Sequence, residues 1–306
     1  MNWKHKALLQ FVFSNVSFGE TLNYFFQRLV TKSLPTNDAR LASKVSFAKD
    51  HIDVCRKYFV RPLEKAIFYE FGAGWDMIIP FVFYALGVET QILVDVRKLL
   101  RPKLVNHTIK QLQQIGLQIE LLRKPDYFLD EGMNFLPSLK NLYGIEYRAP
   151  CDARHTGLKS ESIDCITSTN VLEHIPSGDI EAILIECHRL LKNDGLISFR
   201  IDYQDHYSYF DSRISVYNFM QYSDKNWKIF SPALQYQNRL RHRDYLHLFR
   251  KAEFEVVEEQ CTEGTAADLE IIKMLRLDER FKEYSLEELA VRNALIVLRK
   301  RRAEDV

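Results

Sequence analysis

The stretch that decides the fold is "SIDCITSTNVLEHIPSGDIEAILIECHRLLKNDGLISFRI", residues Ser162–Ile201. Its first part, residues 162–170, is an apolar run that ends in small polar residues, and this pattern predicts a buried strand. An amphipathic segment follows, with Ser177 as its expected N-terminal cap and Gly195 as its expected stop. A second strand is expected over Leu196–Asp202. A strand, a helix and a strand in this order predict a βαβ unit with parallel strands.

The same alternation continues on both sides of this unit. Further strands are expected over residues 66–71, 90–96, 254–259 and 294–300. Helical patterns lie between them, including one that ends at Gly116 and one over about 242–252. Repeated alternation of strands and helices predicts an α/β fold with a mostly parallel sheet. Such sheets bind ligands at the carboxyl ends of their strands, near the point where the strand order reverses.

The sequence also indicates how the chain is organised. Residues 1–60 are expected to form an N-terminal helical extension, broken at Ser33–Asp38, where Asn37 or Asp38 can cap the next helix. Residues 61–306 are expected to form the main domain. This domain carries two insertions, a polar and aromatic one over about 203–241 and a helical one over about 265–289. The first insertion is long for a plain connection, and long loops at the ligand face tend to be functional.

Composition excludes several classes of protein. The chain has 306 residues, of which 46% are hydrophobic, so it is long enough for a large globular core. Lys plus Arg number 42 and Asp plus Glu 41, so no overall basic field favours nucleic acid as a partner. The five cysteines are scattered without a C-x-x-C motif, which indicates reduced thiols in the cytoplasm and neither disulfides nor a zinc site.

The N-terminal segment is rich in aromatic residues and has some features of a targeting signal. Polar residues interrupt its apolar stretch and no small-residue cleavage site follows, so we expect no signal peptide. No run of about 18 apolar residues occurs, so we expect no transmembrane segment. Contact with a membrane surface is an alternative to the simpler expectation of a helix that packs on its own domain or on a partner.

Acidic and glycine residues occur where successive strands are expected to end. They are the E-F-G-A-G of residues 70–74, then Asp95, Asp152 and Asn170. Asp95 follows the glycines by about 20 residues, and an acid at that place can accept hydrogen bonds from ribose hydroxyls. A G-x-G alone is weak evidence, because it also occurs in ordinary turns. The order and the spacing of all these positions together predict a nucleoside-binding site.

This order closely resembles the class I S-adenosylmethionine-dependent methyltransferases. The resemblance covers roughly residues 66–202, with the final two strands as a tail, and it is most specific over 162–201. It implies a Rossmann-like, mostly parallel seven-stranded sheet with helices on both faces. It also implies that residues 61–306 form a methyltransferase domain with S-adenosylmethionine as the cofactor.

The family's binding roles can be carried over to the matching positions. The resemblance implies a glycine turn beside the methionine portion (Glu70, Gly72, Gly74), a ribose ligand (Asp95), an adenine edge (Asp152 and the Ala153 backbone) and a residue near the departing methyl (Asn170). Each of these residues taken alone could equally be a turn glycine or a loop cap. Their shared order favours the binding role.

One position departs from the family pattern. Asp76 stands where the family often has a third glycine, and the bulky Trp75 precedes it. A dinucleotide needs close backbone approach there for its pyrophosphate, and an acid would repel that group. Asp76 therefore argues against NAD, and so against an oxidoreductase, and is compatible with a cationic sulfonium ligand. Trp75 either walls the pocket or packs the helix on the sheet.

The segment after the fifth strand supplies the catalytic candidates. Transfer of a methyl group to a hydroxyl requires a base, and His206 is the best single candidate because its pKa lies near working pH. Asp202 or Asp205 is expected to orient it. The alternative is a surface histidine among solvated carboxylates. A metal-dependent variant that uses these acids and the histidine stays open, although no metal site is predicted.

The acceptor is the least determined part of the sequence. Candidate substrate-binding residues are Asp211, Tyr222, Asn238 and Arg239. Aromatic residues among acids and amides favour a carbohydrate acceptor, and the pattern weakly resembles bacterial methyltransferases found with polysaccharide-building enzymes. We therefore expect methylation of a hydroxyl of a sugar or glycan precursor. Alternatives are a small metabolite, a lipid-like acceptor, or a non-catalytic S-adenosylmethionine-binding partner subunit. The N-terminal helices either cap the site or build a homodimer.

Overall fold

One seven-stranded sheet forms the centre of the molecule in the computed structural model, which describes residues 2–115 and 121–301. The strand order is β3-β2-β1-β4-β5-β7-β6. The strands are β1 (Ile67–Phe71), β2 (Thr90–Val94), β3 (Ile145–Arg148), β4 (Ile163–Thr169), β5 (Leu191–Asp202), β6 (Phe254–Thr262) and β7 (Asn293–Lys300). The first five pair in parallel, whereas β7 runs antiparallel between β5 and β6. The predicted Rossmann-like, mostly parallel sheet is confirmed.

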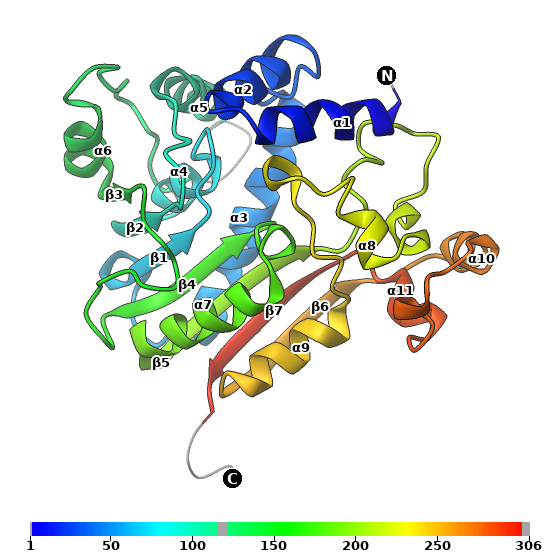
Figure 1. The fold of residues 1–306 in the computed structure, drawn as a ribbon. Coiled ribbons are helices and arrows are strands. Elements are labelled where there is room, and N and C mark those ends of the chain that lie inside the picture. Colours follow the sequence, from blue (N-terminus) through cyan, green and yellow to red (C-terminus); the bar gives the residue numbers. More distant parts are fainter. Residues whose placement is uncertain (1, 116–120, 302–306) are drawn as a thin grey trace.

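Helices cover both faces of this sheet, as expected. The α-helices of the described residues are α1 (Trp3–Ser14), α2 (Gly19–Leu29), α3 (Asp38–Tyr58), α4 (Ile78–Ala85), α5 (Pro102–Ile115), α6 (Phe135–Tyr143), α7 (Ser177–Leu190), α8 (Asp224–Trp227), α9 (His242–Lys251), α10 (Ala266–Met274) and α11 (Leu286–Ala290). Figure 1 shows α7 and α9 in front of the sheet and α3 behind it. Among the described residues, no helix is long and apolar enough to cross a membrane.

Alternation along the strands divides the interior into two cores. Successive side chains of a strand point to opposite faces, so neighbouring residues enter different cores. Phe68 and Leu196 pack in the core under α3 and α4, whereas their neighbours Tyr69 and Ile197 pack in the core under α7 and α9. Both strands are therefore buried on both faces, which explains their almost continuous apolar sequences.

Helix α3 belongs to the layers of the sheet. Its apolar side chains share a core with β1 and α4. His51 lies fully buried on this helix, with Nδ1 2.7 Å from Ser198 Oγ and Nε2 3.1 Å from Thr169 Oγ1. Burial lowers the pKa of His51 to about 3, so the ring is neutral. Helix α3 therefore packs on the sheet, whereas α1 and α2 lie outside its layers.

Some predicted boundaries of elements differ from the observed ones. Helix α7 ends at Leu190 and β5 begins at Leu191, which pairs with Ile163, so the chain enters the strand without a loop. Gly195 was expected to stop the helix but lies inside β5, where the pairing register shifts. Ser177 is the first residue of the helix and makes no side-chain cap. Helix α6 was not predicted, and the expected stop Gly116 lies outside the described residues.

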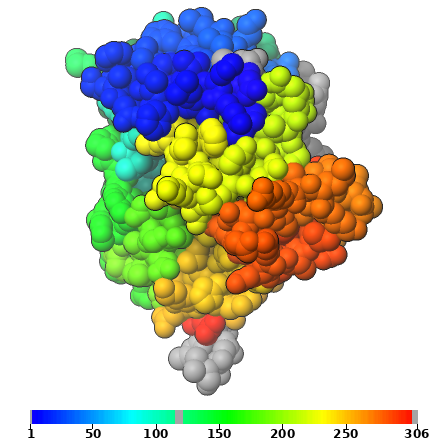
Figure 2. Space-filling model, turned by 45° about the vertical axis from the view of Figure 1, so that its right-hand side comes forward, coloured from blue at the N-terminus to red at the C-terminus, as the bar shows by residue number. Residues whose placement is uncertain are grey.

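A third apolar cluster, here called the cap cluster, joins segments that are far apart in the sequence. Its buried members are Trp3, Ala7, Tyr207, Tyr217, Phe219, Met220, Trp227, Ile272, Phe281, Leu289 and Ala290. They come from α1, from the segment after β5 and from the region of α10 and α11. Figure 2 shows the N-terminal layer resting on the yellow segment around residue 230, which borders the orange C-terminal insert. Helix α1 is therefore held by packing on the predicted insertions.

Candidate functional site

Two cavities meet at the turn after β1. The smaller has a volume of about 470 Å³ and the larger about 660 Å³. Both are lined by Gly72, Gly74 and Val171. These residues follow β1 and β4, which are neighbours at the point where the strand order reverses. This is the place at which open α/β sheets bind their ligands.

The two glycines of the turn have different reasons to be glycine. Both have positive φ angles, +82° at Gly72 and +71° at Gly74, which L-residues with a side chain rarely adopt. A Cβ atom on Gly72 would lie 2.6 Å from both γ-carbons of Val171, so this glycine allows close packing. A Cβ atom on Gly74 would meet no atom within 4 Å. Gly74 therefore leaves its backbone open to a ligand in the cavities.

Asp95 lies in the wall of the smaller cavity, after β2. Its carboxylate accepts hydrogen bonds from the backbone N–H groups of Arg97 at 3.1 Å and Gly74 at 3.3 Å. Burial raises the pKa of Asp95, and the two backbone donors act in the opposite direction. These two hydrogen bonds hold the carboxylate beside the glycine turn, at the wall of the smaller cavity. The sequence analysis predicted a ligand for ribose hydroxyls at this residue.

Asp152 and Ala153 also line the smaller cavity. Both oxygens of Asp152 accept from Arg154, which also donates to Asp179 at 2.6 Å. The hydrogen bond from Arg154 lowers the pKa of Asp152, so this carboxylate stays ionised. The structure therefore brings Asp95, Asp152 and Ala153 around one cavity, and Asp152 already has a charged partner there.

Glu70 and Asn170 face the larger cavity. Glu70 Oε2 and Asn170 Oδ1 are buried and have no hydrogen-bond partner in the part of the chain that the structure describes. Burial raises the pKa of Glu70 to about 8, because an unpaired charge is costly in the interior. Two unpartnered acceptors beside the open Gly74 fit the cationic methionine end of S-adenosylmethionine. The residues present therefore fit the cofactor that the resemblance implied.

Asp76 has a role that the sequence analysis did not predict. Its carboxylate accepts from Thr36 Oγ1 at 2.7 Å and from Lys44 Nζ at 2.9 and 3.0 Å. The sequence analysis found this charge compatible with a sulfonium ligand, but in the structure Lys44 and Thr36 already bind the carboxylate. Trp75 lines the larger cavity and stacks on Tyr24 of α2, with ring centroids 5.5 Å apart. Both residues tie the N-terminal segment to the glycine turn.

The larger cavity is lined mainly by polar side chains from opposite ends of the chain. From the N-terminal 50 residues come Gln27, Ser33, Thr36, Arg40, Ser43 and Lys44, and from the region of β5 and β7 come Arg200, Asp202, Gln204, Tyr209 and Asn293. Asp202 accepts from the backbone of Gln204 at 3.0 Å and from the Tyr209 hydroxyl. This carboxylate is therefore held in place at the wall of the cavity.

His206 lies beside Asp202, as the sequence analysis expected. Its Nε2 is 3.2 Å from Asp202 Oδ2, and its ring stacks on Tyr209 with centroids 5.4 Å apart. The ring lines the smaller cavity, whereas Asp202 lines the larger one. Asp205, the other expected orienting group, is fully buried and accepts from Asn218 Nδ2 at 2.8 Å and from the Tyr207 backbone at 2.9 Å. Asp202 is therefore the carboxylate that contacts the His206 ring.

The four predicted substrate-binding residues line neither cavity. Asp211 accepts from the backbone of Trp3 at 3.0 Å, and the Tyr222 ring packs edge-on against Trp3 at 6.0 Å. Asn238 Nδ2 donates to the carbonyls of Leu172 and Ile175, and Arg239 is 2% exposed and donates to the Phe219 carbonyl at 2.9 Å. These contacts correct the expectation, because they use the polar groups to hold α1, the turn after β4 and the cap cluster.

Two polar residues after β4 were not assigned a role from the sequence. Glu173 is 2% exposed, and both its carboxylate oxygens lack a hydrogen-bond partner among the described residues. Burial, and then the nearby Asp202 carboxylate, raise the pKa of Glu173 well above its usual range. His174 lines the smaller cavity, and burial lowers its pKa to about 4. The signal that could have drawn attention to them is an acid and a histidine directly after a predicted buried strand.

One family model and several solved structures are similar to this chain. Residues 134–199 match the family model described as a methyltransferase domain. No curated protein matches the sequence. Similar solved structures include YcgJ of Bacillus subtilis (13% identity, TM-score 0.44, 86% of this chain and 100% of that one). Others are an S-adenosylmethionine-dependent methyltransferase of Methanosarcina mazei (12%, 0.46, 81% and 97%) and the 1,6-didemethyltoxoflavin-N1-methyltransferase of Burkholderia thailandensis, whose structure contains S-adenosylhomocysteine (13%, 0.46, 92% and 87%).

Proposed function

We propose that this chain, a class I S-adenosylmethionine-dependent methyltransferase, transfers a methyl group to a hydroxyl of a sugar or glycan precursor. The observation that carries this proposal is the larger cavity, which begins at the glycine turn and is lined mainly by hydrogen-bonding side chains. A cavity of this kind fits a hydroxyl-rich acceptor of small size. Side chains with hydrogen-bonding groups outnumber the apolar ones in its lining, although Leu34, Phe47, Trp75, Ile78, Ile79 and Val171 also contribute.

The two cavities suit two different molecules. In the proposed arrangement the smaller cavity holds the adenosine portion of the cofactor, with Asp95 on the ribose hydroxyls and Asp152 and Ala153 at the adenine. Glu70 and Asn170 meet the methionine portion where the cavities join. The acceptor then occupies the larger cavity. This division aligns the two reactants across the glycine turn, and such alignment is a large part of catalysis by proximity.

When bound, S-adenosylmethionine would supply the methyl group: the acceptor oxygen would bond to the methyl carbon as the carbon–sulfur bond breaks, and the electron pair would stay on sulfur. A neutral hydroxyl is a poor nucleophile, so its proton must leave as the new bond forms. Asp202 is the group that we propose as proton acceptor, because it lines the larger cavity and is fixed by Gln204 and Tyr209. His206, which the sequence analysis named as the best candidate for the base, lies 3.2 Å from this carboxylate but lines the smaller cavity.

The aromatic residues after β5 give less support for a sugar acceptor than the sequence suggested. Most aromatic residues after β5 are buried in the cap cluster, and of them only Tyr209 lines the larger cavity. Phe47 and Trp75, from elsewhere in the chain, supply further rings. Rings beside acids, amides and hydroxyls still suit the apolar and polar faces of a sugar. The support for a carbohydrate therefore comes from the lining of the cavity rather than from the sequence of the insertion.

A panel assay tests this proposal. The purified chain would be incubated with S-adenosylmethionine carrying a deuterated methyl group and with monosaccharides, nucleotide sugars, small hydroxylated metabolites or lipid-like alcohols. We expect a labelled sugar product by mass spectrometry, with release of S-adenosylhomocysteine. Labelling of lipid-like alcohols alone would contradict the acceptor. Tight cofactor binding without consumption by any acceptor would favour a non-catalytic subunit.

A further inference from the structure

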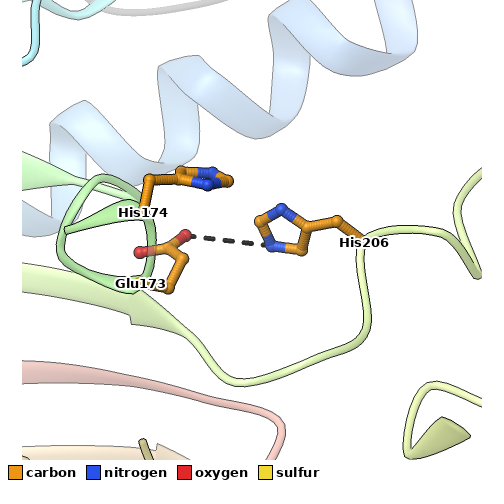
Figure 3. Close-up of side chains that lie close together, drawn as sticks. All are labelled: Glu173, His174 and His206. Carbon is orange, nitrogen blue, oxygen red and sulfur yellow. Dashed lines mark ion pairs between the residues drawn. The ribbon is translucent and has the colours of Figure 1, made fainter. Parts of the chain in front are cut away.

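We propose that Glu173, His174 and His206 form a binding site for one divalent first-row transition-metal ion. Each residue offers one ligand atom, and these atoms all lie within 4.8 Å of one another. Figure 3 shows the Glu173 carboxylate directed at the His206 ring, with the His174 ring beside them. The site joins the turn after β4 to the segment after β5. This inference goes beyond the methyl transfer proposed above and does not depend on it.

The first argument is the state of Glu173. A buried carboxylate normally has hydrogen-bond donors, because an unpaired charge in the interior costs several kcal/mol. Glu173 is 2% exposed, and neither of its oxygens has a donor among the described residues. Its nearest basic atom is His206 Nε2, at 3.9 Å from Oε1, which is too long for a hydrogen bond. A bound cation would give this carboxylate the partner that it lacks.

The second argument is the orientation of His174. Its Nδ1 lies 2.7 Å from the Tyr236 carbonyl oxygen. A carbonyl can only accept, so Nδ1 carries the proton and Nε2 keeps its lone pair. This is the arrangement found behind metal-bound histidines, in which the second nitrogen donates to a carbonyl or carboxylate that fixes the ring.

The third argument is the balance of charge. His206 Nε2 lies between two carboxylates, at 3.2 Å from Asp202 and 3.9 Å from Glu173. A dication bound here would balance the charge of the Asp202 and Glu173 carboxylates. The ligand atoms must move slightly closer together when an ion binds. Around a tetrahedral zinc ion with bonds of about 2.0–2.1 Å, ligand atoms lie about 3.3 Å apart.

One carboxylate and two imidazoles favour some metal ions over others. Imidazole nitrogens with a carboxylate suit zinc, manganese, iron, cobalt and nickel. Magnesium prefers oxygen ligands and keeps several waters, so two histidines disfavour it. We therefore expect tight binding of Zn²⁺ and Mn²⁺ and weak binding of Mg²⁺.

A second cluster provides an internal comparison. His242, Glu259 and Cys261 also bring possible ligand atoms together. Here the groups already have partners, because His242 Nε2 lies 2.8 Å from Glu259 and Nδ1 lies 2.9 Å from the Tyr203 hydroxyl. Glu259 also reaches the solvent, with 38% of its side chain exposed. This cluster has no unsatisfied buried charge, and we do not expect it to hold the ion.

Calorimetric titration of the chelator-stripped full chain with ZnCl₂ or MnCl₂ tests the proposal. We expect one ion per chain, and Glu173→Gln should weaken binding at least about 100-fold, as loss of a charged ligand does. Glu259→Gln is the matched control and should keep the affinity within about twofold. Absence of binding, equal binding by E173Q, or loss of the ion in E259Q would each overturn the proposal.

A spectroscopic measurement on the unaltered chain guards against misfolding of a variant. Mn²⁺ bound to the wild type should show nitrogen couplings from two imidazoles in pulsed electron paramagnetic resonance. A signal without nitrogen coupling would contradict the site. Cofactor titration of the stripped protein separates the two proposals, because a failed metal site leaves S-adenosylmethionine binding and methyl transfer intact.

Discussion

The two cavities differ in how the chain builds them. The smaller one is walled mainly by residues that directly follow β1, β2, β3 and β4, together with the segment near Tyr236. The larger one shares the ends of β1 and β4 with the smaller one. Its other walls are α2, α3 and the segment between them from one end of the chain, and the end of β5, the segment after it and the start of β7 from the other. The sheet itself creates the first cavity, whereas long-range packing completes the second. We therefore expect cofactor binding and acceptor binding to respond to different substitutions.

The largest effect is expected from Asp202→Asn. If Asp202 accepts the proton of the acceptor, its loss should lower kcat about 1,000-fold and leave the affinity for the cofactor within about threefold. Steady-state kinetics and calorimetry measure the two quantities. Asp205→Asn is the control, because Asp205 bonds to Asn218 inside the protein, so it should reduce stability but not kcat. A D202N enzyme with full turnover would remove this carboxylate from the mechanism.

Asp95→Ala should have the next largest effect, on the other cavity. Removal of a carboxylate that binds two ribose hydroxyls should weaken cofactor binding about 100-fold. Asp152→Ala should cost less, because Arg154 already occupies that carboxylate and the Ala153 backbone remains. Calorimetric titration with S-adenosylmethionine measures both. An Asp152 variant that binds more weakly than the Asp95 variant would reverse the assignment of the two acids.

The two glycines of the turn allow a matched pair of substitutions. Gly72→Ala would place a methyl group against Val171 in a positive-φ conformation and should cost about 2–4 kcal/mol of unfolding free energy. Gly74→Ala shares the strained φ but meets no atom, so it should cost about 1 kcal/mol and mainly weaken cofactor binding. Urea denaturation and calorimetry distinguish the two outcomes. Equal losses of stability would contradict the clash with Val171.

The smallest effect is expected from Lys44→Met. This variant keeps most of the side chain but leaves Asp76 with Thr36 as its remaining side-chain donor, which should cost about 1–2 kcal/mol. Because Lys44 lines the larger cavity, the KM for the acceptor should rise while the cofactor affinity stays the same. An unchanged KM with weaker cofactor binding would contradict the proposed division of the cavities.

The same contrast explains what could be predicted from the sequence. The sheet, its strand ends and the placement of Asp95, Asp152 and the glycines follow from local patterns, because each of these residues lies next to a strand with a clear apolar signature. The wall of the larger cavity does not follow from local patterns. Lys44 reaches Asp76 across 32 positions, and no spacing rule connects them.

The prediction of substrate-binding residues in the insertion was wrong for a related reason. Asp211, Asn238 and Arg239 look like exposed binding groups in the sequence, but they satisfy backbone groups in the interior. Burial of a polar side chain depends on what packs around it, and here α1 and the C-terminal insert supply that packing. Glu173 is the opposite case: it is a buried acid whose carboxylate oxygens have no hydrogen-bond partner among the described residues. Only the three-dimensional structure shows this, because the sequence does not tell which groups surround a side chain.

Calorimetric titration of the full chain with S-adenosylmethionine tests the central claim most directly. We predict one-to-one binding by the wild type, about 100-fold weaker binding by the Asp95→Ala variant and unchanged binding by the Lys44→Met variant. Absence of S-adenosylmethionine binding together with tight binding of NAD would contradict the account.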